Sequence, residues 1–244
     1  MKKIDSVEKY FVGLTPPFLL FEKEYHSLDY VVENHNNDRY YKDHNPACQV
    51  AFIGILSYFE AFCKHQFAAA INIFPELAFS FSEKRKNLKI DLSTIISLRE
   101  NTFENLGFIL AEKYDFGSAS SINSNFRDLL LITPFSKKRT KIFEEIIYKR
   151  NLFVHHAGFY TLQSLNTLKI DVSEQEAKAF VDNVSINMSI YQEYADFLFK
   201  TALAITRETI KALKSLEEFK PLDQNSSKFK AIEELGVGVY DRID

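Results

Sequence analysis

The sequence is poor in the residues that break helices and form tight turns. It has seven glycines and six prolines among 244 residues, about 5% for the pair against about 12% in average proteins. A fold of many strands needs more turns than these residues supply, so a predominantly β structure is excluded. Because 46% of the residues are hydrophobic and 23 are phenylalanine, intrinsic disorder is excluded as well. The composition predicts an all-α fold.

Cysteine and excess positive charge are scarce too. Cys48 and Cys63 lie about 22 Å apart if one helix carries both, which is too far for a disulfide bond. The formal net charge of −3 excludes a protein coated with basic residues for non-specific binding of nucleic acid. Any contact with RNA must therefore be local.

No targeting or membrane-spanning segment is evident. The lysines near the start are not followed by an apolar run of signal-peptide length. The most apolar stretch, residues 47–74, is interrupted by Glu60 and Lys64 and ends before Pro75. We expect a cytoplasmic protein that does not contact a membrane.

Apolar residues at steps of three and four predict a series of helices. The most prominent is a long central helix, buried on most sides, that begins with Asn45 as N-cap and Pro46 as first helical residue. A further helix begins at Thr133-Pro134 or at Ser136 and runs to 157. A long closing helix begins at Ser173, where Glu176 completes a capping box. Shorter helices are expected at 18–34, 92–98, 102–114 and 121–132.

The chain shows no domain boundary. We expect one helical domain over 1–244, with 1–44 as an N-terminal helical extension and 221–244 as a peripheral tail. Residues 159–172 lack helical spacing and predict an extended excursion or a short hairpin. The apolar stripe of the closing helix is expected to run from Ala177 through Phe180, Val184 and Met188 to Ile205; these positions all follow helical steps.

The expected helix over 136–157 collects polar groups that can handle a phosphodiester. Asn151 and His155 lie four residues apart and point the same way, and the Arg150 side chain is long enough to reach them. Arg binds phosphate oxygens with two hydrogen bonds, and His transfers protons near neutral pH. Alternatively, Arg150 and His155 cap carbonyls or form surface hydrogen bonds at a helix end. Spacing alone does not distinguish these interpretations.

The segment RNLFVH at 150–155 resembles the motif of HEPN-superfamily ribonucleases, in which an Arg and a polar residue precede a His. The surrounding segments agree with this resemblance: a long apolar helix with an acidic residue (SYFEAFCKHQF), a turn region (FGSASSINSNFRDLL) and a closing helix opened by DVSEQE. Together they resemble the RiboL-PSP-type branch from about residue 45 to 219. The resemblance implies a HEPN-like helical bundle and a metal-independent endoribonuclease without a cofactor. It also implies a homodimer in which the motifs of both protomers line one cleft.

The resemblance assigns roles to residues of this motif helix. It implies that His155 transfers a proton, that Arg150 stabilises the phosphate and the transition state, and that Asn151 orients His155 or the phosphate. Tyr148 is a supporting candidate because it shares the stripe of Asn151. His156 is expected to support the site from the end of the helix, where an imidazole commonly caps carbonyls.

Glu60 is anomalous because it shares a helix side with Leu56 and Cys63, which should be buried. A buried carboxylate needs a cation or a hydrogen-bond donor. One interpretation pairs Glu60 with Arg150 and so holds the guanidinium in place. The other pairs Glu60 with Lys64, another basic side chain or a backbone donor.

Basic residues near the motif are candidates for guiding RNA phosphates to the cleft. They are Lys137, Lys138, Arg139, Lys141 and Lys149. The alternative is a solvated helix face, which is what most charged runs form. The sequence has no P-loop, paired CxxC, GxSxG or HExxH motif, so nucleotide hydrolysis by a P-loop, zinc chemistry and serine hydrolysis have no support. No metal site is expected.

These residues lead us to expect an endoribonuclease of the toxin or phage-defence type that cleaves RNA as a homodimer. The biological setting, including a cognate antitoxin protein as a partner, rests on the resemblance alone. One alternative is a non-catalytic HEPN-like module for dimerisation or partner binding, and another is a helical adaptor unrelated to this superfamily. The joint presence of Arg150, Asn151 and His155 favours the enzyme, because a scaffold has no physical need for all three.

Overall fold

The computed structural model describes residues 6–35, 45–85, 90–98, 104–167, 174–175, 178–216 and 219–239. The predicted all-α class is confirmed, since helices dominate these residues and none of them forms a named strand. The short 3-10 helices are η1 (Val7–Tyr10) and η2 (Val12–Leu14). The α-helices are α1 (Pro17–His35), α2 (Pro46–Ile73), α3 (Leu77–Lys84), α4 (Leu92–Leu98), α5 (Leu106–Ala111), α6 (Ala119–Leu130), α7 (Lys137–His156), α8 (Leu162–Thr167), α10 (Met188–Ser215) and α11 (Ser227–Leu235).

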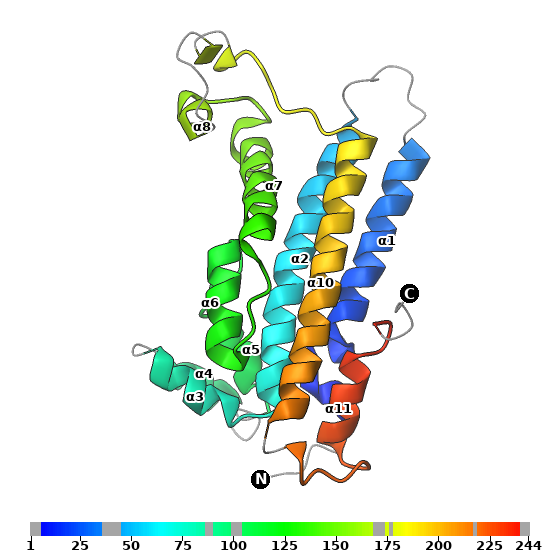
Figure 1. Cartoon of the computed structure of the whole chain (residues 1–244), viewed down its shortest axis with the longest axis vertical. Helices are drawn as coiled ribbons and strands as arrows, with labels where there is room; N and C mark the ends of the chain where they lie inside the picture. Colours follow the sequence, from blue (N-terminus) through cyan, green and yellow to red (C-terminus); the bar gives the residue numbers. More distant parts are fainter. Residues whose placement is uncertain are drawn as a thin grey trace.

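The long helix α2 is the centre of the structure. It packs against both α1 and α10, while α6 and α7 follow one another along its other side (Figure 1). Its N-terminus forms as the sequence predicts, because the Asn45 side chain accepts hydrogen bonds from the backbone N–H groups of Ala47 and Cys48. Helix α2 therefore supplies the surface on which the other long helices pack.

Aromatic side chains connect α2 to its neighbours. The Phe59 ring lies 5.6 Å from that of Phe143 on α7 and 6.0 Å from that of Phe21 on α1, measured between centroids. A second contact joins Phe52 of α2 to Phe153 of α7 at 6.1 Å. These spacings are typical of packed aromatic pairs. They hold the helix that carries the RNLFVH segment at two points along α2.

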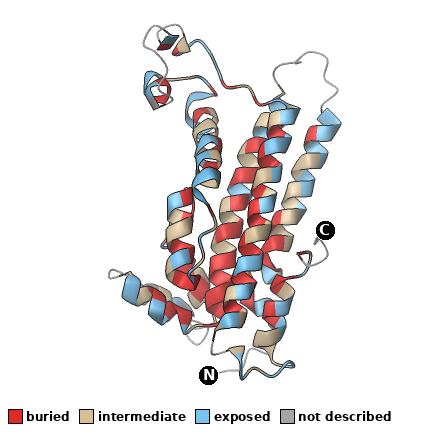
Figure 2. Ribbon diagram, viewed as in Figure 1, coloured by how far each residue is buried: buried red, intermediate tan, exposed pale blue. Residues whose placement is uncertain are grey.

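Burial is uneven along the bundle. Figure 2 shows that buried residues are concentrated on α2 and on the side of α10 that faces it, whereas the end of α7 and the short α8 are mostly exposed or intermediate. By length and composition α2 could also cross a membrane. In this structure it serves as the core helix of the bundle.

The long closing helix begins later than the sequence predicts. Helix α10 starts at Met188, where the Asn187 side chain accepts a hydrogen bond from the backbone N–H of Ile190. The expected helical stripe is wrong at Phe180, whose φ of 62° lies in the left-handed region and whose side chain is 66% exposed. The expected capping-box residues Ser173 and Glu176 lie outside the described residues, as does Ala177.

The excursion after α7 is partly helical. Residues 162–167 form α8, and the strand pairing among the described residues is an isolated bridge between Phe159 and Asn183. The Thr161 and Ser164 side chains explain the local helix start, because each accepts a hydrogen bond from the backbone N–H of the other. Residues 168–172 of the expected excursion lie outside the described part of the chain.

Both chain ends contribute to the core. Helix α11 buries Ala231, Ile232 and Leu235, so the segment expected to be a peripheral tail packs against α10, α2 and η1. The expected N-terminal extension likewise supplies α1, which packs along α2. Apolar residues at steps of three and four explain why the short α11 docks despite its polar surroundings.

Candidate functional site on helix α7

Helix α7 has a well-defined beginning and end. Ser136 is the N-cap, as one of the sequence interpretations expects, and its side chain accepts the backbone N–H of Arg139 at 3.5 Å. At the other end Ala157 takes a left-handed conformation, and the backbone N–H of Gly158 bonds to the carbonyl of Leu152 at 2.9 Å. Gly158 has φ of 86°, and a β-carbon there would lie 3.0 Å from the Phe153 ring. A glycine is therefore required where the motif helix ends.

The structure brings two of the three candidate catalytic residues into direct contact. The Arg150 guanidinium donates a hydrogen bond from Nη1 to Oδ1 of Asn151 at 3.1 Å. Asn151 and His155 are both exposed on the last turns of α7, and Arg150 is half-buried. The His155 side chain is exposed and forms no hydrogen bond with another described residue, so both imidazole nitrogens are available. The arrangement offers a cation, an amide and a titratable group on one helix end.

His156, the neighbouring supporting candidate, is exposed too. Its ring centroid lies 6.4 Å from that of His155, with the two planes at 65°. Consecutive helical residues point about 100° apart, so the two imidazoles face different directions. The carbonyl of His156 accepts the N–H of Phe159, which joins the helix end to the following segment.

Glu60 on α2 responds to the charge of Arg150 without forming an ion pair. Burial raises the pKa of its carboxyl group; the positive charge of Arg150 opposes this rise more than that of Lys64 does, and the negative charge of Asp115 adds to it. No basic nitrogen of the described residues lies within 4.0 Å of this carboxylate. Of the two cations weighed from the sequence, Arg150 therefore has the larger effect on Glu60, acting through space.

Tyr148 belongs to the contact between α7 and α8. Its hydroxyl is buried without a hydrogen-bond partner among the described residues. Burial is the main cause of its raised pKa, and the Ser164 hydroxyl opposes this rise. The residue as a whole is half-buried beside the motif.

Two of the five basic candidates are engaged within the protein. Arg139 donates to the Thr201 hydroxyl at 2.6 Å and lies over the Phe197 ring at 5.4 Å, so it anchors α7 to α10. Burial lowers the pKa of Arg139. Lys149 pairs with Glu145 at 2.7 Å and bonds to the Tyr194 hydroxyl at 2.5 Å.

The remaining basic candidates are solvent-facing. The other three lysine side chains are exposed and form no hydrogen bond or ion pair with another described residue; they belong to Lys137, Lys138 and Lys141. They lie at the start of α7, whereas Arg150 and His155 lie near its end. Any guidance of phosphates by these lysines would therefore act along the length of the helix.

Two features beside the motif have no role assigned from the sequence. The turn around Asp115 and Gly117 approaches Glu60 from the start of α6. A cavity of about 390 Å³ lies just after the motif, lined by Tyr160, Lys178, Val181, Asp182 and Asn183. The sequence predicts the turn itself through the region FGSASSINSNFRDLL, but it gives no signal for the approach of Glu60.

In comparisons with known proteins, no protein family, curated protein or solved structure matches this chain. Among the described residues, no three or more His, Cys, Asp or Glu side chains are grouped so that they could bind a metal ion.

Proposed function

We propose that this protein is a metal-independent endoribonuclease of the HEPN type. The observation that carries the proposal is the contact of Arg150 with Asn151 on the same helix end that exposes His155. Cleavage of RNA by attack of the 2′-hydroxyl on the phosphodiester needs proton transfer and stabilisation of the developing negative charge. An imidazole can provide the first and a guanidinium the second. The similarity of the RNLFVH segment to HEPN ribonucleases supports the same assignment.

In the proposed reaction the 2′-oxygen attacks the adjacent phosphorus, and the bond to the 5′-oxygen of the next nucleotide breaks. His155 accepts or donates a proton, Arg150 binds the phosphate oxygens as negative charge accumulates, and Asn151 orients one of them by hydrogen bonding. The products are a 2′,3′-cyclic phosphate and a free 5′-hydroxyl. A substrate with a 2′-deoxy sugar at the cleavage site lacks the nucleophile and should resist cleavage.

Each protomer offers one His155, and the reaction profits from an acid and a base. We therefore propose a homodimer in which both α7 helices line one cleft. Five apolar side chains around the motif are exposed in the single chain: Val154, Phe159, Leu162, Phe180 and Val181. Their exposure supports the proposal that the second protomer covers this surface. Backbone hydrogen bonds from Tyr160 to Asp182 and from Val184 to Gly158 hold the segment that carries Phe180 against the end of α7.

The decisive experiment incubates purified protein with an RNA oligonucleotide and a DNA oligonucleotide of matched sequence, with and without EDTA. We expect cleavage of RNA alone, unchanged by EDTA, with a 2′,3′-cyclic phosphate or its 3′-phosphate hydrolysis product detected by mass spectrometry. Cleavage of the 2′-deoxy substrate or complete loss of activity with EDTA would contradict the mechanism.

The second candidate function is a non-catalytic module that dimerises or binds a partner, and the exposed apolar residues around the motif favour it. Light scattering at micromolar concentration separates the outcomes. A dimer that leaves RNA intact supports the module, whereas a monomer contradicts the shared cleft. A role in a toxin–antitoxin or phage-defence system, with an antitoxin protein as partner, remains part of the proposal through the family resemblance.

A further inference from the structure

The pocket that follows the motif helix is held by backbone hydrogen bonds. Its volume is about 390 Å³. The backbone N–H of Tyr160 donates to the carbonyl of Asp182 at 3.0 Å, and that of Phe180 donates to the carbonyl of Tyr160 at 2.8 Å. The N–H of Val184 donates to the carbonyl of Gly158 at 2.9 Å. These bonds fix the two segments that line the pocket relative to the end of α7.

The pocket lies close to the candidate catalytic residues. Tyr160 follows His155 by five residues, so their Cα atoms are at most about 18 Å apart. The backbone N–H of Phe159 donates to the carbonyl of His156 at 2.9 Å, which keeps the chain at the helix end. Val181 lines the pocket and also belongs to the exposed apolar surface beside the motif. The pocket therefore borders the cleft proposed for the two protomers.

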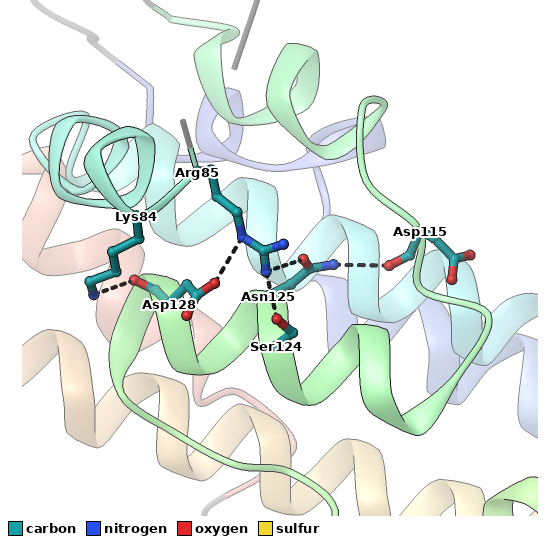
Figure 3. A network of polar contacts seen from close by, with 6 residues as sticks. All are labelled: Lys84, Arg85, Asp115, Ser124, Asn125 and Asp128. Atoms are coloured by element: carbon teal, nitrogen blue, oxygen red, sulfur yellow. Dashed lines mark hydrogen bonds and ion pairs between the residues drawn. The ribbon is translucent and has the colours of Figure 1, made fainter. Parts of the chain in front are cut away.

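A polar network elsewhere in the molecule shows the opposite use of polar groups. Between α3 and α6, Arg85 donates to the Ser124 hydroxyl at 2.7 Å and pairs with Asp128 at 2.8 Å (Figure 3). The Asn125 side chain accepts from Arg85 at 3.3 Å and donates to the backbone carbonyl of Asp115 at 2.9 Å. These hydrogen bonds join elements of the fold to one another.

The pocket instead offers polar groups that the fold does not use. The Asp182 and Asn183 side chains are exposed and form no hydrogen bond with another described residue. Lys178 Nζ pairs with Glu174 at 2.5 Å, which uses one of its three protons. The half-buried Tyr160 adds an aromatic ring to the lining. A ligand in this pocket thus meets a carboxylate, an ammonium group, an amide and a ring.

The charges around the pocket disfavour a phosphate group. The hydrogen bond with Glu174 is the main cause of the raised pKa of Lys178, and the negative charge of Asp182 adds to it. Two carboxylates beside one ammonium group repel an anion. A neutral group with both donors and acceptors fits better. The bases of single-stranded RNA are such groups, and proteins bind them by stacking and by hydrogen bonds to their edges.

Guanine matches these side chains best among the RNA bases. Its Watson–Crick edge carries two neighbouring donors, N1–H and the N2 amino group, which the two oxygens of one carboxylate can accept. Its O6 and N7 atoms accept from a lysine. The other bases offer a carboxylate one donor group at this edge, while an aromatic ring stacks on any base. The volume lies at the lower end of the range of about 300–1,000 Å³ for ligand pockets, which suits one base.

We propose that this pocket binds a guanine base of the RNA substrate near the cleavage site. Asp182 accepts the N1–H and N2 amino protons, Lys178 donates to O6 or N7, and the Tyr160 ring stacks on the base. The role in cleavage rests on the proposed ribonuclease function, whereas the binding of guanine is measurable without cleavage.

The first test titrates GMP, IMP and AMP into the ¹⁵N-labelled protein and follows the backbone amide signals of Tyr160, Asp182 and Asn183 by NMR. All three nucleotides carry the same phosphate, and IMP differs from GMP only by the missing 2-amino group. We expect saturable shifts with GMP and at least about five-fold weaker binding of IMP and AMP. If GMP shifts none of these signals, or if all three nucleotides bind equally, the proposal is overturned.

Variants assign the discrimination to one side chain. Asp182→Asn cannot accept both guanine donors, so it should bind GMP and IMP equally. Glu174→Gln is the matched control, because it removes a neighbouring charge and leaves the lining of the pocket unchanged; it should keep the preference for GMP. A preference that persists in Asp182→Asn, or an equal loss in both variants, overturns the proposal. If Asp182→Asn does not fold, the comparison of the three nucleotides in the natural protein still decides.

Cleavage of a uridine oligoribonucleotide that contains one guanosine identifies the source of the base. We expect cuts at a fixed distance from the guanosine and slower cleavage when inosine replaces it. If GMP binds but cleavage ignores guanosine, the pocket belongs to a free guanine nucleotide and the proposal is overturned.

Failure of the proposed function has a different signature. If no RNA is cut, the ribonuclease function fails, and the 2′-O-methyl form of the same oligonucleotide decides the pocket through fluorescence anisotropy. Tighter binding of the guanosine form than of the inosine form, with the difference lost in Asp182→Asn, supports the pocket. Equal binding of the two forms overturns it.

Discussion

The two halves of α7 use similar side chains for different purposes. In the first half Phe143 and Ile146 are buried, and the Arg139 side chain is hydrogen-bonded to α10. In the second half only Leu152 is fully buried, and Arg150 bonds to the neighbouring Asn151. The first half is anchored by buried side chains, whereas the second half, held by Phe153 and Lys149, also presents polar groups to solvent. The comparison teaches that a cation on this helix can be assigned to RNA only after its contacts within the fold are known.

The largest expected effect separates the two histidines at the presenting end. His155→Ala should reduce RNA cleavage by about 10²–10⁴-fold, as removal of an acid–base group does, while the thermal midpoint and the dimer stay unchanged. His156→Ala should cost far less, because its ring points away from that of His155. If His156→Ala is the inactive variant and His155→Ala stays active, the assignment built on Asn151 is wrong.

The anchoring half should respond in stability instead. Phe143→Ala removes a fully buried ring that packs on Phe59 and Phe135, so we expect a loss of about 3–5 kcal/mol in the free energy of unfolding. Val154→Ala is the comparison in the second half: that side chain is 46% exposed in the single chain, so the unfolding free energy of the monomer should change by under about 0.5 kcal/mol. Urea unfolding measures both, and equal losses would contradict the division of the helix.

A smaller effect distinguishes the anchored cation from a solvated one. Arg139→Gln loses the bond to Thr201 and the contact with Phe197, which should cost about 1–3 kcal/mol of unfolding free energy. Lys138→Gln should change stability little, because Lys138 is exposed. Instead, it should reduce the salt dependence of RNA binding measured by fluorescence anisotropy. A large loss of stability in Lys138→Gln would contradict the distinction between an anchored Arg139 and a solvent-exposed Lys138.

The smallest expected effect is a pH dependence of the unfolding free energy caused by Glu145, which lies near the boundary of the two halves. The hydrogen bond from Lys149 is the main cause of the lowered pKa of Glu145, and burial opposes it. A group with a lowered folded pKa stabilises the fold above its unfolded value of about 4.3 and loses this contribution as the pH falls through the folded value. Between pH 5 and 3 the unfolding free energy should therefore fall more in the natural protein than in Glu145→Gln.

Because Glu145 is 51% exposed, the difference between the two proteins should stay under about 1 kcal/mol. Denaturation in urea at pH 7, 5 and 3 measures it. Identical pH profiles would show that the contact of Glu145 with Lys149 and Tyr194 contributes nothing to stability.

Local signals in the sequence predicted several helix starts. Asn45 with Pro46 and Ser136 act as expected, because a cap needs only a side-chain oxygen and the next few backbone N–H groups. A longer pattern misled, because the apolar stripe at helical steps from Ala177 to Ile205 predicted one continuous helix, whereas Phe180 is exposed and has a left-handed backbone. The stripe was interrupted by backbone hydrogen bonds between Tyr160 and both Phe180 and Asp182, which join segments that no local rule connects.

The sequence by itself determined the all-α class, the central position of α2 and the grouping of Arg150, Asn151 and His155 on one helix end. These depend on composition, on apolar periodicity and on spacing along a single helix, all of which are local properties. The tertiary structure alone decided that Arg139 and Lys149 bond to α10, and that Glu60 of α2 approaches the turn at Asp115 and Gly117. Such contacts depend on how separate elements pack, and the distances between side chains on different helices are not encoded in any short segment.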